Sequence, residues 1–590
     1  MTTTARGAIA RTPRALLTVA AIAVAFAAAD TYVVVLALPD MMSGVGLSID
    51  DLQRGAPIIS GFLLGYVAML PLIGRIADLR GRLPVLVAGL VVFSAGSLVT
   101  ALSYDLASMV VGRFLQGLGG GALVPATLAL VADLYPIERR AVPLGLVSAV
   151  QELGSVLGPL GGAVVLVLAG WRGIFAVNLL AGIVLMLAVV AVRGRRPRPL
   201  RPTAGRPDLL GLGLLVVAVA AGVLVMVQPG PIMRDLTWGQ LFIPHVGELR
   251  WSTDVGLVAV AAAALLLARC WFARRPLVDL RGWAASSRGI DLPGALLLAV
   301  ALGGVILAFA TADPSRQVLS AGGVWYLLAA AVAVTALVLH LRRAVDPLLP
   351  VAALRARPAW GAVVVSFLIG AALVAALIDV PLFARTTIYG DSQVRAALVL
   401  VRLLLALPAG AVAGGVLTRR LPAGLVTALG MGCAALGFAA MARWDADALH
   451  HAAATVPLVV SGLGFGLALA PVNATLLAST PSGVHGVASS LVVVARMVGM
   501  LIGISALTTV GLRAYYRASA SIPPMAQVCG HDTMCSAYSD RLQQAAIVQE
   551  HVVFAGAAGA ALLAGVLALA LFRGAPTGAV GGSDPLPRMG

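Results

Sequence analysis

Charged side chains lie inside the long apolar runs of this chain, where each of them is costly. A charge in the hydrocarbon core of a membrane costs about 2.5–3.5 kcal/mol on the insertion scale, so it persists only with a partner or a task. A carboxyl group kept away from water can take up and release a proton near neutral pH, whereas an arginine stays charged. The charged residues within the apolar runs predict proton exchange or, alternatively, static ion pairs that hold helices together. These residues are Asp30, Arg113, Glu152, Asp379, Arg402 and Arg496.

The composition indicates that those runs are membrane spans. Of the 590 residues, 60% are hydrophobic and 11% are charged, whereas soluble domains carry about 25% charged residues. This balance excludes a secreted disulfide scaffold, a nucleic-acid-binding domain and a coiled coil. The net charge of +16 would suggest a nucleic-acid partner in a soluble chain. Here the charges stand in short connections between apolar runs, so we expect an all-α polytopic membrane protein and no nucleic acid.

Sixteen apolar runs are long enough to cross a bilayer, which takes roughly 20 residues. They group as a six-helix bundle in residues 1–192, a central segment with four spans in 193–357, a second six-helix bundle in 358–573 and a tail in 574–590. The expected spans are 16–37, 55–73, 83–101, 106–130, 141–167, 172–192, 208–228, 255–273, 291–311, 322–341, 360–384, 395–418, 422–442, 455–478, 486–513 and 546–572.

Arginines predict the orientation of these spans. They concentrate in the even-numbered connections, such as residues 74–82, 139–140 and 193–206, and cytoplasmic loops are rich in arginine. Arginines also precede the first apolar run, which is typical of a retained anchor rather than a cleaved signal. We therefore expect a multi-pass protein of the cell (inner) membrane, with both termini in the cytoplasm.

The four central spans resemble a duplicated pair. RPDLLGLGLLVVAVAAGVLV is similar to GIDLPGALLLAVALGGVIL, and each is followed by a second apolar run. Duplication of a pair leaves the orientation of every later span unchanged. The alternative is a chance similarity between apolar segments. Six spans on each side of this insertion are typical of transporters built from two repeated halves, which handle substrate near the midplane between them.

A charged turn, GRIADLRGR at residues 74–82, joins the second and third spans. Gly74 and Gly81 allow a tight turn, and Asp78 can occupy the N-terminal end of a helix and pair with a nearby arginine. Arg80 and Arg82 are the adjacent candidates. A generic charged loop is the alternative, but the pattern G-x-x-x-D-x-x-G-R between these two spans is more specific than that.

Glycines and a proline mark the fifth span, in the string GSVLGPLGG. Small residues four apart let helix backbones approach closely, and Pro159 removes a backbone hydrogen bond and permits a bend. Plain helix packing is the ordinary meaning of such spacing. The glycines are Gly154, Gly158, Gly161 and Gly162.

Together these motifs resemble the major facilitator superfamily. The turn at 74–82 is similar to its signature loop, GSVLGPLGG is similar to the motif of its drug/proton antiporters, and GRFLQGLGGG, which contains Arg113, is a third match. AADTYVVV, QELGSVLGPL and HGVASSLVVVARMVGMLIG resemble the 14-helix triacylglyceride transporters within it. The chain departs from the pattern in the extra helix pair, in Arg402, and in Leu79, where the family has Arg or Lys and we expect Arg80 to substitute.

The resemblance implies a fold, a site and a partner. The fold would be two six-helix bundles plus inserted central helices, with the 74–82 loop latching the cytoplasmic side of the outward-facing state. Asp30 would carry the proton. Glu152 would pair with Arg496, since the fifth and eleventh core spans are neighbours in the superfamily. A periplasmic lipid-binding lipoprotein would be the partner.

A polar segment, residues 512–551, separates the last two spans on the expected outer side. It predicts a helix extension, a Pro-Pro break and a helix leading into the last span. Such a segment can raise a lipid path above the membrane or dock a partner, and an ordinary exposed loop is the alternative. Cys529 and Cys535 would lie on the oxidising side, where a small disulfide can form.

Two transport functions fit these residues. The first is a proton-coupled exporter of a triacylglyceride-like lipid from the inner membrane to the periplasmic side by alternating access. The alternative is a proton/multidrug antiporter for amphiphilic compounds. A membrane enzyme is disfavoured because the sequence has no phosphate-cradling P-loop and no GxSxG elbow. We expect a monomer that binds protons and a lipid or amphiphilic molecule, needs no metal or cofactor, and is driven by the proton gradient.

Overall fold

In the computed structural model, the regular elements of the described residues are helices, as the sequence predicts. The described residues are 3–47, 52–194, 208–274, 276–287, 291–310, 320, 322–344, 347, 355–389, 392–529 and 535–577.

The N-terminal half contains six predicted spans. Its elements are α1 (Thr3–Gly44), α2 (Leu52–Leu63), the π-helix η2 (Leu64–Ala68), α3 (Leu70–Arg80), α4 (Arg82–Ala101), α5 (Leu106–Leu134) and α6 (Ala141–Gly194).

The central segment contains two helix pairs, α7–α9 and α11–α12. Its elements are α7 (Leu209–Val227), α8 (Gly230–Met233), α9 (Asp254–Phe272), α10 (Leu280–Ser287), α11 (Leu292–Ala310) and α12 (Gly323–Leu341).

The C-terminal half contains the last six spans. Its elements are α13 (Arg357–Thr387), α14 (Gln393–Leu417), α15 (Ala423–Met441), α16 (Thr455–Ala478), α17 (His485–Ala520), α18 (Met525–Cys529) and α19 (Ser536–Leu571).

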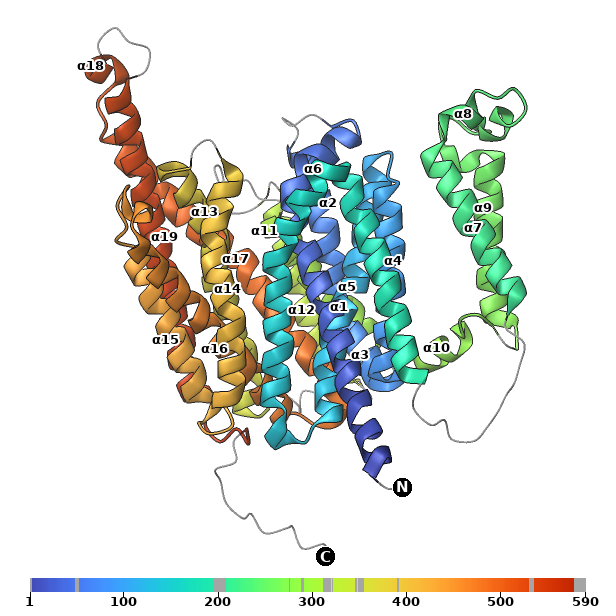
Figure 1. Cartoon of the computed structure of the whole chain (residues 1–590), viewed down its shortest axis with the longest axis horizontal. Coiled ribbons are helices and arrows are strands. Elements are labelled where there is room, and N and C mark those ends of the chain that lie inside the picture. Colours follow the sequence, from blue (N-terminus) through green and yellow to red (C-terminus); the bar gives the residue numbers. More distant parts are fainter. Residues whose placement is uncertain are drawn as a thin grey trace, which may run out of the picture.

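Helix α6 holds two of the predicted spans. Its 54 residues would extend about 80 Å if straight, far more than the roughly 30 Å of a bilayer core. At Gly170 the backbone adopts φ 66° and ψ −178°, a conformation open to glycine, and the chain folds back on itself (Figure 1). We call residues 141–169 the first limb and residues 171–194 the second limb. Fifteen helical stretches of the described residues are long and apolar enough to span a membrane, with α6 counted once. Each of the sixteen predicted spans therefore has a helical counterpart.

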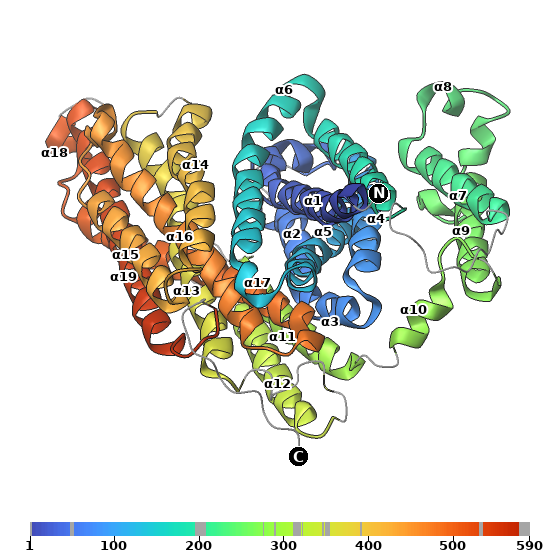
Figure 2. The same ribbon diagram turned by 60° about the horizontal axis from the view of Figure 1, so that its bottom comes forward.

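Each half packs around its own apolar core. In the N-terminal half, α1 lies between the two limbs of α6, as both views show (Figures 1 and 2). In the C-terminal half, α13 packs against α17 and α19, and α14 packs against α16. The C-terminal core comes mainly from α13–α16 and α19 and the N-terminal core mainly from α1–α6, with residues of α16 and α17 contributing to both. The division into two bundles agrees with the repeated-half architecture that the sequence suggests.

The two halves meet where glycines replace larger side chains. A Cβ added at Gly145 of the first limb would lie 2.5 Å from the carbonyl oxygen of Ala411 on α14, and one at Gly415 would lie 2.6 Å from that of Ala141. Both distances are too short for a side chain, so α14 and the first limb approach backbone to backbone. This contact and the contact of α17 with α3 join the halves.

The two central pairs share one internal design. The carboxylate of Asp208 accepts a hydrogen bond from the N–H of Gly211 and pairs with Arg269 of α9 at 2.7 Å. Asp291 accepts one from the N–H of Gly294 and contacts His340 of α12 at 2.6 Å. In each pair, the aspartate that opens the first helix is bound to a basic residue near the end of the second. This equivalence supports duplication.

The two pairs differ in their contacts with the rest of the molecule. Helix α11 packs against α2, η2 and α17, so it touches both halves. The α7–α9 pair stands to one side (Figure 1) and joins the bundle through α10, where Arg80 stacks on Trp283 at 4.9 Å, and through Arg250 over the Tyr104 ring at 4.1 Å. The second pair is thus built into the body of the protein and the first is peripheral.

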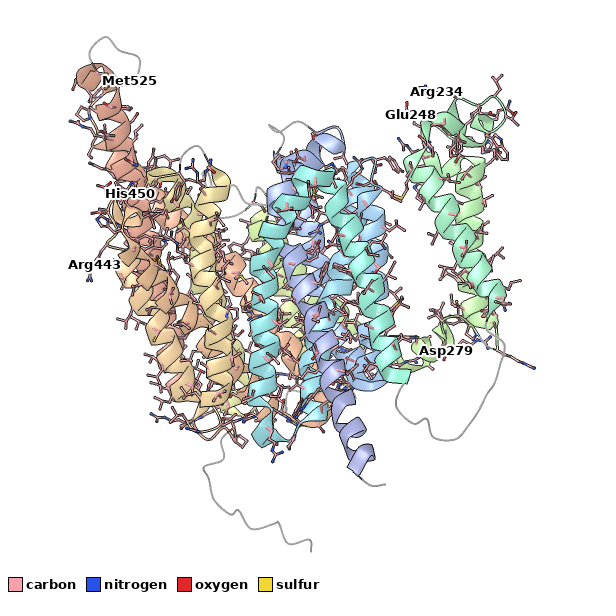
Figure 3. The ribbon with its side chains drawn as sticks, in the orientation of Figure 1. Arg234, Glu248, Asp279, Arg443, His450 and Met525 are labelled. Carbon is pink, nitrogen blue, oxygen red and sulfur yellow. A yellow bond between two sulfur atoms is a disulfide. The ribbon has the colours of Figure 1, made fainter. Side chains whose placement is uncertain are left out.

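Helices α17 and α19 continue beyond the bundle as a paired extension. Each has 36 residues, about 54 Å of helix, and Met525 of α18 lies at the tip (Figure 3). A disulfide joins Cys529 to Cys535. The helix extension, break and returning helix follow the arrangement that the sequence predicts.

Candidate functional site

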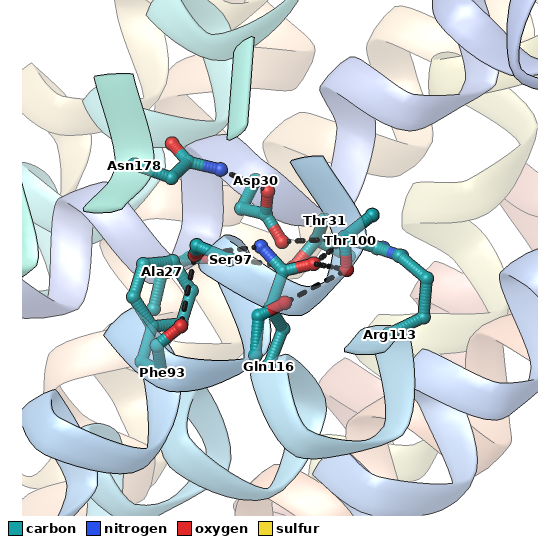
Figure 4. Close-up of polar contacts among 10 residues, drawn as sticks. Ala27, Asp30, Thr31, Phe93, Ser97, Thr100, Arg113, Gln116 and Asn178 are labelled. Carbon is teal, nitrogen blue, oxygen red and sulfur yellow. Dashed lines mark hydrogen bonds and ion pairs between the residues drawn. The ribbon is translucent and has the colours of Figure 1, made fainter. Parts of the chain in front are cut away.

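Asp30 of α1 stands at the centre of a buried polar network in the N-terminal half (Figure 4). One carboxylate oxygen contacts the Arg113 guanidinium at 2.9 Å, and the other accepts a hydrogen bond from the side-chain amide of Asn178 on the second limb. Asp30 and Arg113 are each 1% exposed. A buried ion pair repays the loss of hydration only when its partners also make further hydrogen bonds. The Asp30 carboxylate makes such a bond with Asn178.

Arg113 has further partners besides Asp30. Its guanidinium donates to Gln116 at 3.0 Å, and the Gln116 amide donates to Ser97 at 3.0 Å. Arg113 and Gln116 are three residues apart, so they lie on the same face of α5. The guanidinium also lies over the ring of Phe62, 4.3 Å from its centroid, an arrangement that favours a cation. These contacts hold the charge of Arg113 in place independently of the carboxylate.

Glu152 of the first limb faces Arg496 of α17 across the junction of the two halves. Their charged atoms are 3.7 Å apart, and both side chains are about one-tenth exposed. A charge-assisted hydrogen bond between such groups is about 2.7–2.9 Å long, so this pair is an ion pair with room to shorten or separate. A small cavity between α1, the first limb, α13 and α17 surrounds it.

Helix α1 separates the two ionic sites. Ala28 and Thr31 line the cavity that holds Glu152 and Arg496, whereas Asp30 lines a different cavity on the other side of the helix. A shift or rotation of α1 would therefore act on both sites together. The structure does not join Asp30 and Glu152 by any direct contact among the described residues.

Asp78 links α3 to the beginning of α17. Its two carboxylate oxygens accept hydrogen bonds from the backbone N–H groups of Gly486 and Val487, at 2.9 and 3.1 Å. Both belong to the first turn of α17, whose N–H groups lack partners within the helix and where the helix dipole also favours a negative charge. Gly74 and Gly486 pack backbone to backbone, since a Cβ at either would lie within 2.5 Å of the other's carbonyl oxygen. The predicted cytoplasmic loop thus contacts the other half of the molecule.

Arg82, and not Arg80, pairs with Asp78. The Arg82 guanidinium lies 2.9 Å from the Asp78 carboxylate and 3.3 Å from Asp133. Arg80 points to α10, where it stacks on Trp283. The substitution of Arg80 for the basic residue expected at Leu79 stays a prediction, and in this structure Arg80 contacts α10 rather than Asp78. Arg82 is the first residue of α4, so the turn at Gly81 brings its side chain back over the end of α3 to Asp78. Gly81, between α3 and α4, has φ 91°, which provides the turn.

Three glycines of the fifth-span motif bring the first limb of α6 against α1. A Cβ at Gly154 would lie 2.1 Å from the Ala25 carbonyl oxygen, and one at Gly158 would lie 2.4 Å from that of Ala29. A Cβ at Gly162 would instead meet the side chain of Val33. Gly161 differs, because no atom lies within 4 Å of its added Cβ. The side chain of Pro159 lies outside the described residues.

Asp379 and Arg402 do not join either site. Asp379 is buried in α13 of the C-terminal half, and Arg402 of α14 donates to the hydroxyl of Thr455 at 3.0 Å. Glu550 of α19, 1% exposed, is a further buried carboxylate. One of its oxygens accepts a bond from Gln549 at 3.4 Å, and the other has no hydrogen-bond partner.

The family model described as Major Facilitator Superfamily matches residues 20–345. The chain belongs to the Major Facilitator Superfamily. A triacylglyceride transporter of Mycolicibacterium smegmatis is 35% identical over 516 residues, which cover 86% of this chain and 76% of that protein. A triacylglyceride transporter of Mycobacterium tuberculosis is 35% identical over 550 residues, which cover 90% of this chain and 89% of that protein.

Solved structures share the fold at low identity. A human organic anion transporter aligns with a TM-score of 0.54 and 14% identity, covering 94% of this chain and 99% of that one. A proton:xylose symporter aligns with a TM-score of 0.51 and 14% identity, covering 94% and 95%. This superfamily member is therefore a multi-pass membrane transporter, with two helical halves plus the inserted central pairs.

Sequence reasoning missed three side chains of this superfamily member. Gln116 and Asn178 complete the network around Asp30, and Glu550 is the second buried carboxylate of the C-terminal half. Gln116 carried a signal, since it stands three residues after Arg113 within GRFLQGLGGG. Asn178 is the isolated polar residue of FAVNLLAG, and Glu550 stands near the polar end of the last apolar run. The sequence reasoning considered only charged residues inside the apolar runs. It therefore passed over the uncharged amides of Gln116 and Asn178 and a carboxyl group at the end of a run.

Proposed function

We propose that this transporter is a proton-coupled exporter of a triacylglyceride-like lipid, from the inner membrane to the periplasmic side, by alternating access. The relatives named triacylglyceride transporters, 35% identical over most of the chain, support the choice of substrate. The buried pair of Asp30 and Arg113 is the observation that supports the proton coupling. The same proposal places both termini in the cytoplasm, on the arginine pattern of the connections.

Asp30 is the proton site in this proposal. A proton on Asp30 replaces the attraction of Arg113, and the guanidinium keeps Gln116 and the Phe62 ring as partners. The cost of separating the pair is thereby reduced, because neither group is left without a contact. Loss of the proton restores the pair and draws α1 back toward α5.

The Glu152–Arg496 distance and the Asp78 contacts change with the conformational state in this proposal. With Asp78 on the start of α17, the cytoplasmic ends of the two halves are held together, so this is an outward-facing state in the proposed orientation. Movement of α1 with protonation changes the cavity around Glu152 and Arg496. The pair then shortens or separates as the halves rock.

The remaining assignments follow from this transport cycle. The energy comes from the proton gradient, with no metal or cofactor, and the transporter acts as a monomer. The extension formed by α17, α18 and α19 rises beyond the bundle on the proposed periplasmic side, where a lipid-binding lipoprotein would receive the substrate. A proton/multidrug antiporter for amphiphilic compounds is the second candidate, since the same ionic sites would serve it.

Transport in proteoliposomes tests the proposal. A fluorescent triacylglycerol and a cationic dye are compared with a pH gradient, and again after an ionophore has collapsed it, with protein-free vesicles as the control. Triacylglycerol movement above the control that requires the gradient is the expected result. Movement of the dye alone would favour the antiporter for amphiphilic compounds. Triacylglycerol movement that ignores the gradient would contradict proton coupling.

A further inference from the structure

A groove with a volume of about 300 Å³ runs along α1 between the two limbs of α6. Asp30 and Asn178 are its polar lining residues, and the others are apolar side chains and glycines. Ile22 of α1, Leu157 of the first limb and Val177 of the second limb line it and are about half exposed. The groove therefore opens to the outer surface of a membrane-spanning bundle. It lies apart from the cavity between the halves.

The wall of the first limb combines close packing with open space. Gly158 is pressed against the backbone of α1, whereas a Cβ at Gly161 would meet nothing within 4 Å. Packing of the protein against itself therefore explains the glycine at 158 but not the one at 161. A larger residue at 161 would project into the groove, so the glycine leaves that space free.

Hydrocarbon suits this space better than water does. A buried water needs two to four polar partners, but only Asp30 and Asn178 offer polar atoms here, and they already bind each other and Arg113. An empty groove would forfeit the dispersion contacts of its apolar walls. The surface onto which it opens faces the acyl chains of the bilayer.

We propose that an acyl chain of a bilayer phospholipid occupies this groove and lies against Asp30 and Asn178. The phospholipid is the source because its chains surround the exposed rim residues, and its charged head group stays at the membrane surface, since the groove is lined by apolar side chains and glycines apart from Asp30 and Asn178. The chain excludes water from Asp30 on the membrane side. Protons then reach Asp30 only from the interior of the transporter.

Photo-crosslinking tests the site. The full chain is reconstituted in vesicles of phosphatidylethanolamine and phosphatidylglycerol, doped with a phosphatidylcholine that carries a diazirine in one acyl chain. After irradiation, peptide mapping should place label in residues 22–33, 157–165 and 174–178. Gly161→Leu and Val177→Trp fill the groove from opposite walls, and each should reduce that label several-fold. Gly213→Leu is the matched control, because Gly213 of α7 is also exposed with open space around it, and it should leave the label unchanged.

Several outcomes would overturn the proposal. These are absence of label from the three segments, label that persists in both filling variants, and label obtained with a diazirine triacylglycerol but not with the phospholipid. Size-exclusion profiles show whether each variant is folded, and the two variants act on separate limbs. The inference goes beyond the proposed function, and crosslinking requires no transport, so failure of the transport assay would leave this result standing.

Discussion

The two halves of the transporter bury their carboxyl groups in different ways. In the N-terminal half, Asp30 is bound by Arg113 and by Asn178. In the C-terminal half, Asp379 and Glu550 are as deeply buried, but among the described residues neither has an arginine or histidine within ion-pair distance. Aromatic rings surround this region, with Phe383 and Phe554 6.4 Å apart.

In the proposed function, this difference separates a carboxylate that exchanges protons from carboxyl groups that stay protonated. A carboxylate paired with an arginine can exchange that partner for a proton, so its state can follow a gradient. An unpaired charge in an apolar interior is too costly to keep, so we expect Asp379 and Glu550 to remain neutral throughout the cycle. The buried carboxyl groups of this structure thus differ in their partners, and in the proposed function only Asp30 couples transport to protons.

Removal of Arg113 should have the largest effect on stability. Arg113→Met leaves Asp30 buried without its cation, which costs about 3–5 kcal/mol, whereas Glu550→Gln should change stability by less than about 1 kcal/mol. Thermal unfolding in detergent measures both. The double variant Asp30→Asn/Arg113→Met should recover most of the loss. Equal destabilisation by Arg113→Met and Glu550→Gln would contradict the distinction between the halves.

Helix-packing glycines should behave alike in the two halves. Gly158→Val and Gly499→Val each place a side chain against a carbonyl oxygen, of Ala29 and Phe367 respectively, and a Cβ there would lie within 2.4 Å. Overpacking of this kind costs typically 1–3 kcal/mol, seen as a lower unfolding temperature. Gly161→Ala is the matched control with free space and should be neutral. A neutral Gly158→Val would show that the limb and α1 are not in close contact.

Loss of the Asp78 contacts should shift the conformational equilibrium. Asp78→Asn weakens two charge-assisted bonds to the start of α17, and a change of about 1.4 kcal/mol shifts a two-state population about tenfold. Distances between spin labels at residues 79 and 483 should lengthen in that variant. Arg80→Gln is the control and should leave them unchanged, because Arg80 contacts Trp283. A label distance that lengthens in Arg80→Gln but not in Asp78→Asn would contradict the role of Asp78 in holding the two halves together.

The smallest effect is expected at the peripheral helix pair. The Arg269 guanidinium and the N–H of Gly211 hold the pKa of Asp208 below its usual range. A lowered pKa contributes stability above the unfolded value, which is lost as pH falls through the folded value. Limited proteolysis between α9 and α10 should therefore increase slightly in acid, and Asp208→Asn should show the same increase at neutral pH. Equal cleavage at acid and neutral pH would show that the contacts of Asp208 do not stabilise the α7–α9 pair.

Span positions and motif contacts could be predicted from the sequence, because they depend on local patterns. Uninterrupted apolar length predicted all sixteen helices, including the two within α6 that Gly170 separates. The Glu152–Arg496 contact followed from charges within spans together with a family resemblance. Arg82, which pairs with Asp78, was one of the two arginines that the sequence offered, but the sequence did not distinguish it from Arg80.

Uncharged partners that are distant in the chain could not be predicted. Asn178 lies 148 residues from Asp30, and a neutral amide in an apolar run gives no sign of what it contacts. The groove beside Asp30 also depends on how two limbs diverge around α1, which no local pattern encodes. The isolation of Asp379 from Arg402 likewise emerges only from the packing of α13 and α14.

Gradient-driven transport by Asp30→Asn and by Asp379→Asn, measured side by side in proteoliposomes, distinguishes a coupling role of Asp30 from a general effect of removing a buried carboxyl group. Both changes replace one carboxyl oxygen by an amide nitrogen, so they differ chiefly in location. Asp30→Asn should abolish uphill movement of fluorescent triacylglycerol but retain downhill exchange without a gradient, and Asp379→Asn should retain both. Uphill transport that survives Asp30→Asn, or that is lost equally in both variants, would contradict the assignment of coupling to the N-terminal half.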